Sequence, residues 1–203
     1  MPRILNAGTH CAALAWLLLA APCFGTAVIS VGDYVLQANQ AAQPVQIFVS
    51  GGEQVQGLNL YVQVADGGAF AGGTATGPTI SSVDILTGTI FATSNTGQRG
   101  GADGPLFWEA STTTRLSPSF VTADGLLATV FIDTTGIFSG TFALRTDPPL
   151  ANSDFADPGI SVAFINGSIT VPEPSTVLVG LIGVACLAGC VHRRGMVGGS
   201  CRR

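Results

Sequence analysis

Apolar and polar residues alternate along most of the chain between residues 28 and 171. The alternation is clearest over residues 45–49, 58–64 and 126–132. Because successive side chains of a strand point to opposite faces, this period of two gives each strand one apolar face. In the third segment the expected apolar face consists of Leu126, Ala128, Val130 and Ile132. Further strands are expected at residues 34–38, 80–93, 106–111, 142–144 and 160–171.

Turn-forming residues separate these segments, and no window shows a helical period. Clusters of Gly, Pro, Asn and Asp lie between the alternating stretches, as is typical of turns. Two segments rich in Gly and Thr, residues 69–78 and 93–104, are expected to be surface loops. The pattern predicts an all-β fold, a β-sandwich or jelly roll of eight or nine strands.

The first 27 residues have the pattern of a secretory signal peptide. Arg3 precedes an uninterrupted apolar run at residues 11–21, which suits a signal peptide and is too short to span a bilayer. Cleavage after Ala27, with Gly25 three positions before the cut, is the preferred prediction, and cleavage after Gly25 is the alternative. We therefore expect an exported protein whose mature domain covers residues 28–171.

A second apolar run, residues 176–191, contains no charged residue and is followed by Arg193 and Arg194. As a helix it would rise about 24 Å at 1.5 Å per residue, slightly less than a hydrocarbon core of about 30 Å. Basic residues after the run favour a cytoplasmic C-terminus. The sequence therefore predicts a transmembrane helix with the preceding domain outside the inner membrane.

The residues just before this run form a short motif, which consists of Val171, Pro172, Glu173, Pro174, Ser175 and Thr176. Motif, apolar run and arginine pair, in this order over residues 171–194, resemble the PEP-CTERM sorting signals of Gram-negative bacteria. The resemblance implies that an exosortase, an intramembrane transpeptidase, processes the chain in addition to the signal peptidase that the N-terminal segment implies. It also implies an inner-membrane-anchored precursor that is delivered to the cell envelope, cell surface or extracellular matrix. The tail at residues 195–203 runs past the usual basic end of such signals.

The composition of the predicted domain excludes most catalytic chemistry. Residues 28–171 contain three arginines and eleven carboxylates but no Cys, His or Lys. Triads with His or Cys, zinc sites and Schiff bases therefore cannot form, and a basic face for nucleic acid is missing. We predict a non-enzymatic protein without a cofactor. A glycosidase that uses two carboxylates is a further alternative, because it needs no other residue type.

Three local patterns are candidate sites. Four oxygen ligands in one loop form a candidate calcium site, although turn formation is the interpretation that we favour; they are Asp147, Asn152, Asp154 and Asp157. Trp108 and Glu109 could stack on a sugar, but one buried and one exposed strand position is the simpler interpretation. The Asn166-Gly167-Ser168 sequon is expected to be a turn or bulge before the last strand.

Several strand phrases resemble the cohesin-like sandwich domains of bacterial surface and scaffold proteins. They are the opening Val31-Gly32-Asp33, the strand at residues 58–64, the segments at residues 85–91 and 124–131, and the closing segment at residues 160–171. Cohesins bind calcium-dependent dockerin modules through one sheet face, so the resemblance implies an alternative function. In that alternative the domain is a binding module that recruits a surface protein or an extracellular glycan. No individual contact residue carries over, because the matching phrases are core strands.

Overall fold

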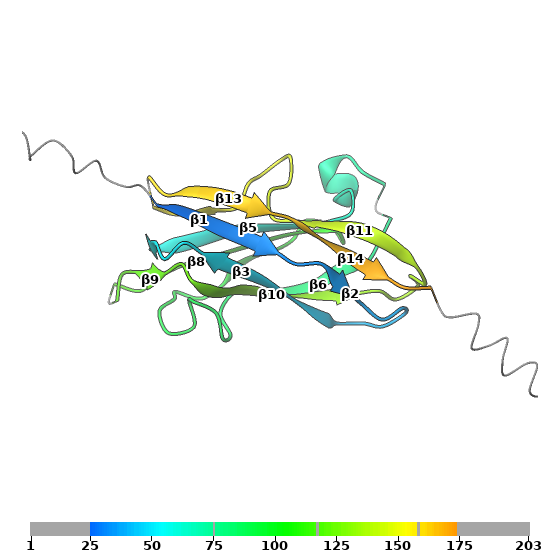
Figure 1. The fold of residues 1–203 in the computed structure, drawn as a ribbon, viewed down its shortest axis with the longest axis horizontal. Coiled ribbons are helices and arrows are strands. Elements are labelled where there is room, and N and C mark those ends of the chain that lie inside the picture. The colour runs from blue at the N-terminus through cyan, green and yellow to red at the C-terminus, as the bar shows by residue number, and fades with distance from the viewer. Residues whose placement is uncertain (1–24, 75, 117, 158, 174–203) are drawn as a thin grey trace, which may run out of the picture.

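The computed structural model describes residues 25–74, 76–116, 118–157 and 159–173, and these form an all-β sandwich (Figure 1). They contain fourteen strands and one 3-10 turn, η1 (Gly68–Ala71). The predicted fold class is confirmed, whereas the predicted count of eight or nine strands is too low. The strands are β1 (Thr26–Val31), β2 (Tyr34–Val35), β3 (Gln43–Ser50), β4 (Gln54–Val55), β5 (Gly57–Val64), β6 (Thr79–Asp84), β7 (Arg99–Ala102), β8 (Phe107–Thr113), β9 (Val121–Thr122), β10 (Gly125–Asp133), β11 (Gly140–Arg145), β12 (Asp154–Phe155), β13 (Ser161–Ile165) and β14 (Gly167–Val171).

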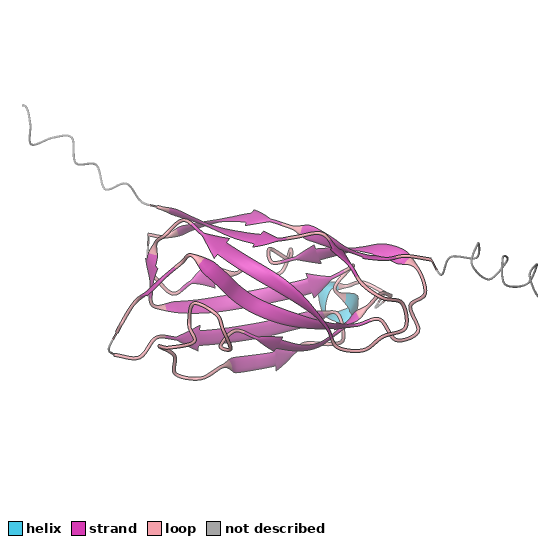
Figure 2. Cartoon of the chain, turned by 60° about the horizontal axis from the view of Figure 1, so that its bottom comes forward, coloured by secondary structure: helices cyan, strands magenta, loops and turns pink. Residues whose placement is uncertain are grey.

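Two sheets make up the sandwich, and Figure 2 shows that strands form almost all of its regular structure. The five-stranded sheet has the order β13-β1-β3-β10-β6. The seven-stranded sheet has the order β2-β14-β11-β5-β8-β7, with β12 paired to β5. β4 and β9 form a separate small pair. β1 begins at one end of the sandwich and β14 ends at the other (Figure 1).

The core lies between the two sheets and is formed by every second residue of the long strands. In β3, Val45, Ile47 and Val49 are buried while the residues between them are exposed. In β5, Leu60 and Val62 are completely buried. Each such side chain contributes about 1.5–3 kcal/mol when it leaves water. Because no cysteine lies between residues 25 and 173, this burial takes the place of a disulfide framework.

The apolar face of β10 differs from the predicted one at its start, where the strand contains a bulge. The register of β10 against β3 shifts between Leu126 and Ala128. As a result Leu127 is completely buried and Leu126 is only half-buried, contrary to the simple alternation expected. The prediction is wrong only at Leu126, before the bulge, since Ala128, Val130 and Ile132 after it are buried as expected. An extra residue reverses the alternation across the bulge, and one sequence period cannot reveal such a shift.

The strand predicted over residues 80–93 is wrong beyond Asp84, where β6 ends. The Asp84 carboxylate accepts hydrogen bonds from the backbone N–H groups of Leu86 (2.8 Å) and Thr87 (2.9 Å), which turns the chain. Burial raises the pKa of Asp84, but the hydrogen bonds from Thr87 and Leu86 outweigh it, so the pKa is lowered overall. The apolar residues after this turn are still buried, as Ile85 and Phe91 show.

The closing segment, expected as one strand over residues 160–171, is two strands in different sheets. β13 pairs in parallel with β1, whereas β14 pairs with β11 and β2. The chain changes sheets at Asn166, the one residue between the two strands, where the sequence predicts a turn or bulge. Gly167 follows at once, and a Cβ there would overlap the carbonyl oxygen of Gly32. This close approach requires glycine, and it fixes both sheets at one point.

The two ends of the domain differ slightly from the predicted boundaries. β1 begins at Thr26, and Ala27 is completely buried, so the folded domain includes two residues assigned above to the signal peptide. β14 ends at Val171, which is also buried. Residues 1–24 and 174–203, including the predicted transmembrane helix at 176–191, lie outside the described residues. Among the residues that are described, no helix is long and apolar enough to cross a membrane.

The substitution Gly167→Ala should destabilise the domain by about 1–3 kcal/mol, because the added methyl group meets backbone that cannot move aside. Gly101→Ala is the matched control, since a Cβ at Gly101 meets no atom within 4 Å. The free energy of unfolding in urea measures both effects. Equal stability of the two variants would contradict the proposed constraint at the sheet change.

Candidate functional site

The outer face of the seven-stranded sheet gathers polar side chains from distant parts of the chain. Leu58, Leu60 and Val62 point into the core, so the alternate residues Asn59 and Tyr61 point outward. The strand registers place these outward residues in three rows across β12, β11, β5, β8 and β7. The rows are Asp154, Asn59, Ser111 and Arg99; Tyr61, Glu109 and Gly101; and Arg145, Gln63 and Phe107.

A groove of about 330 Å³ lies at the end of this face, along the first row. We call it the Arg99 groove and define it by Asn59, Thr96, Arg99, Ser111 and Thr113, which contribute most of its polar groups. The Oγ1 atoms of Thr96 and Thr113 share a hydrogen bond of 2.9 Å. No carboxylate lines the groove, so its chemistry is that of hydroxyls, one amide and one guanidinium.

Arg99 differs from the other arginines of the described residues because its guanidinium has no partner there. Arg115 Nε donates to the carbonyl oxygen of Asn95 at 2.8 Å. Arg145 Nε lies 3.5 Å from a carboxylate oxygen of Asp147. Arg99 is exposed and lines the groove. A guanidinium carries five N–H donors in a planar fork that suits a carboxylate, so Arg99 is available to bind an acidic group.

Beside the groove, the second row has acidic and aromatic character. Burial raises the pKa of Tyr61 above its ordinary value, and three nearby carboxylates raise it further, those of Glu109, Asp154 and Asp103. These carboxylates disfavour a phenolate because like charges repel. The outer face therefore presents a free cation next to a cluster of negative charge.

The aromatic residues of this face do not form an open platform for a sugar. Phe107 points outward but is completely buried, with the Phe70 ring 4.5 Å and the Tyr61 ring 6.2 Å from it, measured between centroids. Trp108 packs against the core from the opposite face of β8, and its buried Nε1 has no hydrogen-bond partner within the described residues. Trp108 and Glu109 therefore lie on opposite faces of β8, although both are half-buried rather than one buried and one exposed.

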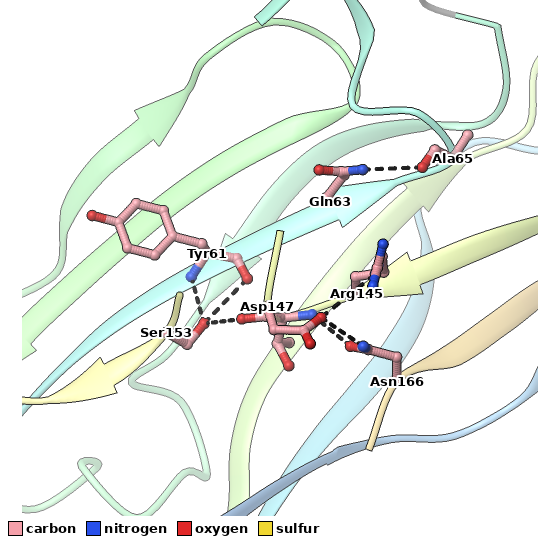
Figure 3. A network of polar contacts seen from close by, with 8 residues as sticks. Tyr61, Gln63, Ala65, Arg145, Asp147, Ser153 and Asn166 are labelled. Atoms are coloured by element: carbon pink, nitrogen blue, oxygen red, sulfur yellow. Dashed lines mark hydrogen bonds and ion pairs between the residues drawn. The ribbon is translucent and has the colours of Figure 1, made fainter. Parts of the chain in front are cut away.

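A polar network fastens the loop after β11 onto β5 (Figure 3). Buried Ser153 accepts a hydrogen bond from the Tyr61 N–H (2.9 Å) and donates one to the carbonyl oxygen of Thr146 (2.7 Å). Asn166 Nδ2 donates to Asp147 (2.6 Å), and Asn166 Oδ1 accepts from the Thr146 N–H (3.1 Å). The network holds β12 against β5 and thereby places Asp154 on the outer face. It also engages both ends of the Asn166 amide, the acceptor of the sequon.

The four residues of the candidate calcium loop are separated rather than gathered. Asp154 accepts a hydrogen bond from Asn59 Nδ2 (2.8 Å), Asp157 accepts one from the Gln56 N–H (2.5 Å), and Asp147 accepts one from Asn166. Asn152 is exposed. In the part of the chain that the structure describes, no three His, Cys, Asp or Glu residues are placed to hold a metal ion. Calcium binding by this loop stays a prediction, and its acids serve here as acceptors for neighbouring strands.

The motif predicted to direct sorting begins where the sheet ends. Val171 is the last residue of β14, and Pro172 and Glu173 are exposed beyond it. Pro174, Ser175, Thr176, Arg193 and Arg194 lie outside the described residues. The motif therefore follows the domain without an intervening linker.

Sequence reasoning missed the Arg99 groove. Residues 93–104 were expected to be a loop, yet they contain the edge strand β7, with Arg99 as its first residue. Similarly, the expected loop at residues 69–78 contains part of η1. The one available signal was that Arg99 is among only three arginines of an acidic domain. Nothing in the sequence shows that Arg99 lies in one row with Ser111 and Asn59.

Comparison with known proteins identifies the fold as a cohesin-like sandwich. No protein-family model matches the sequence, and no curated protein matches it. Among solved structures, the solution structure of CaCohA2 from Clostridium acetobutylicum matches 72% of this chain and 90% of its own, with 25% identity and a TM-score of 0.55.

Two further cohesin structures match over similar lengths. The sixth cohesin of scaffoldin B from Acetivibrio cellulolyticus, solved in complex with a Cel5 dockerin mutant, has 12% identity and a TM-score of 0.53, and the match covers 72% of this chain and 99% of the cohesin. A non-cellulosomal cohesin from Archaeoglobus fulgidus has 16% identity and a TM-score of 0.51, over 76% and 97% of the two chains. The cohesin-like fold inferred from the strand phrases is therefore confirmed.

The Tyr61 phenol should titrate above the ordinary value of 10.0, and Glu109→Gln should lower its pKa by removing one repelling charge. Because the folded-state pKa is raised, the protonated phenol stabilises the fold below the ordinary pKa, and this contribution is lost as the pH rises through the folded value. Ultraviolet titration in a Tyr34→Phe background isolates Tyr61. An unchanged pKa in the Glu109→Gln variant would contradict the electrostatic coupling between Glu109 and Tyr61.

Proposed function

We propose that this protein is an exported, non-catalytic binding module that recruits a surface protein through the outer face of its seven-stranded sheet. The observation that carries the proposal is the Arg99 groove, where an unpaired guanidinium lies among hydroxyl groups on an exposed sheet face. Arginine is over-represented among residues that dominate binding energies. A cation that the domain itself leaves without a partner is suited to this role.

The structural neighbours support a protein partner. The Acetivibrio cellulolyticus cohesin was solved with a dockerin, and CaCohA2 was solved in a complex with a variant of CaDoc0917. The charges of the outer face indicate what a partner must offer here. An acidic side chain would face Arg99, and a basic side chain would face the cluster around Tyr61, because complementary charges give an interface its specificity.

A catalytic role as a glycosidase has less support. That chemistry needs two carboxyl groups on opposite sides of a bound sugar. The residues that line the groove include no Asp or Glu, and the nearby Asp154 is held by Asn59. Trp108, the aromatic residue proposed to stack on a sugar, packs against the core instead.

Photo-cross-linking in the cell envelope tests the binding face. A photo-reactive amino acid at Ser111, on the outer face of the seven-stranded sheet, should give one discrete protein adduct. The same residue at Gln46, exposed on the five-stranded sheet, should give none. Adducts from both positions, or only from Gln46, would contradict the proposal, and a polysaccharide adduct from Ser111 would favour the glycan alternative.

The substitution Arg99→Gln should weaken binding of the cross-linked partner roughly tenfold, because it removes a charged anchor from the groove. Gln46→Glu is the matched control, since it changes the net charge by the same amount on the opposite sheet. Calorimetric titration of each purified variant with the partner gives the dissociation constants. If both substitutions weaken binding equally, net charge rather than the groove governs the interaction.

We also propose that the two terminal segments direct this module to the cell envelope. Signal peptidase would remove the first, and an exosortase-type transpeptidase would cut at or near the motif that begins at Val171. In support, Pro172 and Glu173 are exposed outside the last strand, so a protease can reach them without unfolding the sandwich. The precursor would be anchored in the inner membrane through residues 176–191 before its release to the envelope or matrix.

Expression in a Gram-negative host with and without exosortase tests the sorting proposal. We expect a membrane-retained precursor in the host without exosortase, and a shorter, released product in the host with it. The mass of the product would locate the cut. Identical masses and identical membrane retention in both hosts would contradict sorting, whereas the binding module is judged separately by the cross-linking experiment.

A further inference from the structure

The start of β1 is a structural part of the sandwich, although it lies next to the predicted export signal. Thr26 pairs with Ser161 and Ala27 with Val162 in the parallel ladder between β1 and β13. The hydroxyl groups of Thr26 and Ser161 share a hydrogen bond of 3.1 Å. Ala27 is completely buried in the core. A cut after Ala27 would therefore remove two pairs of the ladder and leave part of the core uncovered.

The residue before β1 lies against a carboxylate. A Cβ at Gly25 would overlap the Glu53 carboxylate, so this carboxylate lies directly against the backbone of Gly25. The loop that carries Glu53 is held in place, since the backbone carbonyl oxygen of Glu53 accepts a hydrogen bond from the Ala123 N–H at 2.7 Å. Within the residues described, the Glu53 carboxylate itself has no hydrogen bond or ion pair.

We infer that the export cut falls at the Gly25–Thr26 peptide bond and that the α-ammonium group freed on Thr26 pairs with the Glu53 carboxylate. This inference rests on the proposed export of the protein. Gly25 and Cys23 occupy the positions where a signal peptidase requires small residues. Hydrolysis breaks the C–N bond, leaving a carboxylate on Gly25 and an ammonium on Thr26, with water as the only co-reactant.

Bond geometry supports the ion pair. Since the Glu53 carboxylate lies against Gly25, the nitrogen of Thr26, two bonds from the Gly25 Cα, is within about 5 Å of it. In the precursor this nitrogen is an uncharged amide. After the cut it carries a positive charge beside an unpaired carboxylate in a strongly acidic domain. Processing therefore adds an attractive interaction at the edge of β1, and the mature domain is more stable than the same fold with a blocked terminus.

The first test is the intact mass and N-terminal sequence of the protein exported from the full chain in a Gram-negative host. A mature protein that begins at Thr26 supports the inference. A protein that begins at Val28, or at any other internal residue, overturns the assigned cut but leaves export standing. A protein that retains Met1 overturns export and, with it, the inference.

The second test uses a property of the sequence: the chain contains no lysine, so the α-amino group is the only primary amine of the mature protein. Acetylation therefore removes this one charge selectively. Acetylation of the wild-type mature protein should lower its Tm by about 1–3 °C. The Glu53→Gln variant should have a similarly lowered Tm, and acetylation should not lower it further.

Wild type and Glu53→Gln, each with and without acetylation, are compared to separate the ion pair from a structural effect of Glu53. If acetylation lowers the Tm of wild type and Glu53→Gln equally, the ammonium does not interact with Glu53 and the ion pair is wrong. If acetylation changes the Tm of neither protein, the ion pair contributes no stability, and this part of the inference is overturned. The N-terminal sequence of the Glu53→Gln variant, expected to begin at Thr26, confirms that both proteins are cut alike.

Discussion

Apolar burial between the two sheets is the interaction on which the rest of this structure depends. The described domain has no cysteine with which to form a disulfide, so the inner faces of β3, β5 and β10 must supply its cohesion. This constraint fixes every second residue of the long strands. It leaves the alternate residues free, and on the seven-stranded sheet these include the polar rows with Asn59, Tyr61 and Arg99. The proposed binding face therefore consists of the strand residues that the core leaves exposed.

The closing segment joins the two sheets and thereby positions the outer face. β13 belongs to one sheet and β14 to the other, with the close contact at Gly167 between them. Asn166, at the crossing point, also holds the loop after β11 through Asp147 and Thr146. That loop brings Asp154 next to Asn59. A single crossing therefore links the integrity of the sandwich to the arrangement of charges on its surface.

The sequence predicted those features that a local pattern determines. Strong alternation placed the strands around Ile47 and Leu60 correctly, because a strand that is buried on one face has an apolar residue at every second position. Short strands such as β12 could not be predicted, because two residues are too few to show an alternation. The bulge at Leu127 could not be predicted either, because a single shifted position leaves no recognisable pattern. The Asp84 turn escaped because buried Ile85 continues the apolar pattern. The Arg99 groove could not be predicted, since its residues come from separate strands that only the sheet order brings together.

The most direct test of the central claim is chemical-shift mapping of the isotopically labelled mature domain during titration with its cross-linked partner. We expect the largest chemical-shift changes at Asn59, Arg99 and Ser111, on the outer face of the seven-stranded sheet. Changes confined to the outer face of the five-stranded sheet, where Phe48 and Ile165 are exposed, would contradict it.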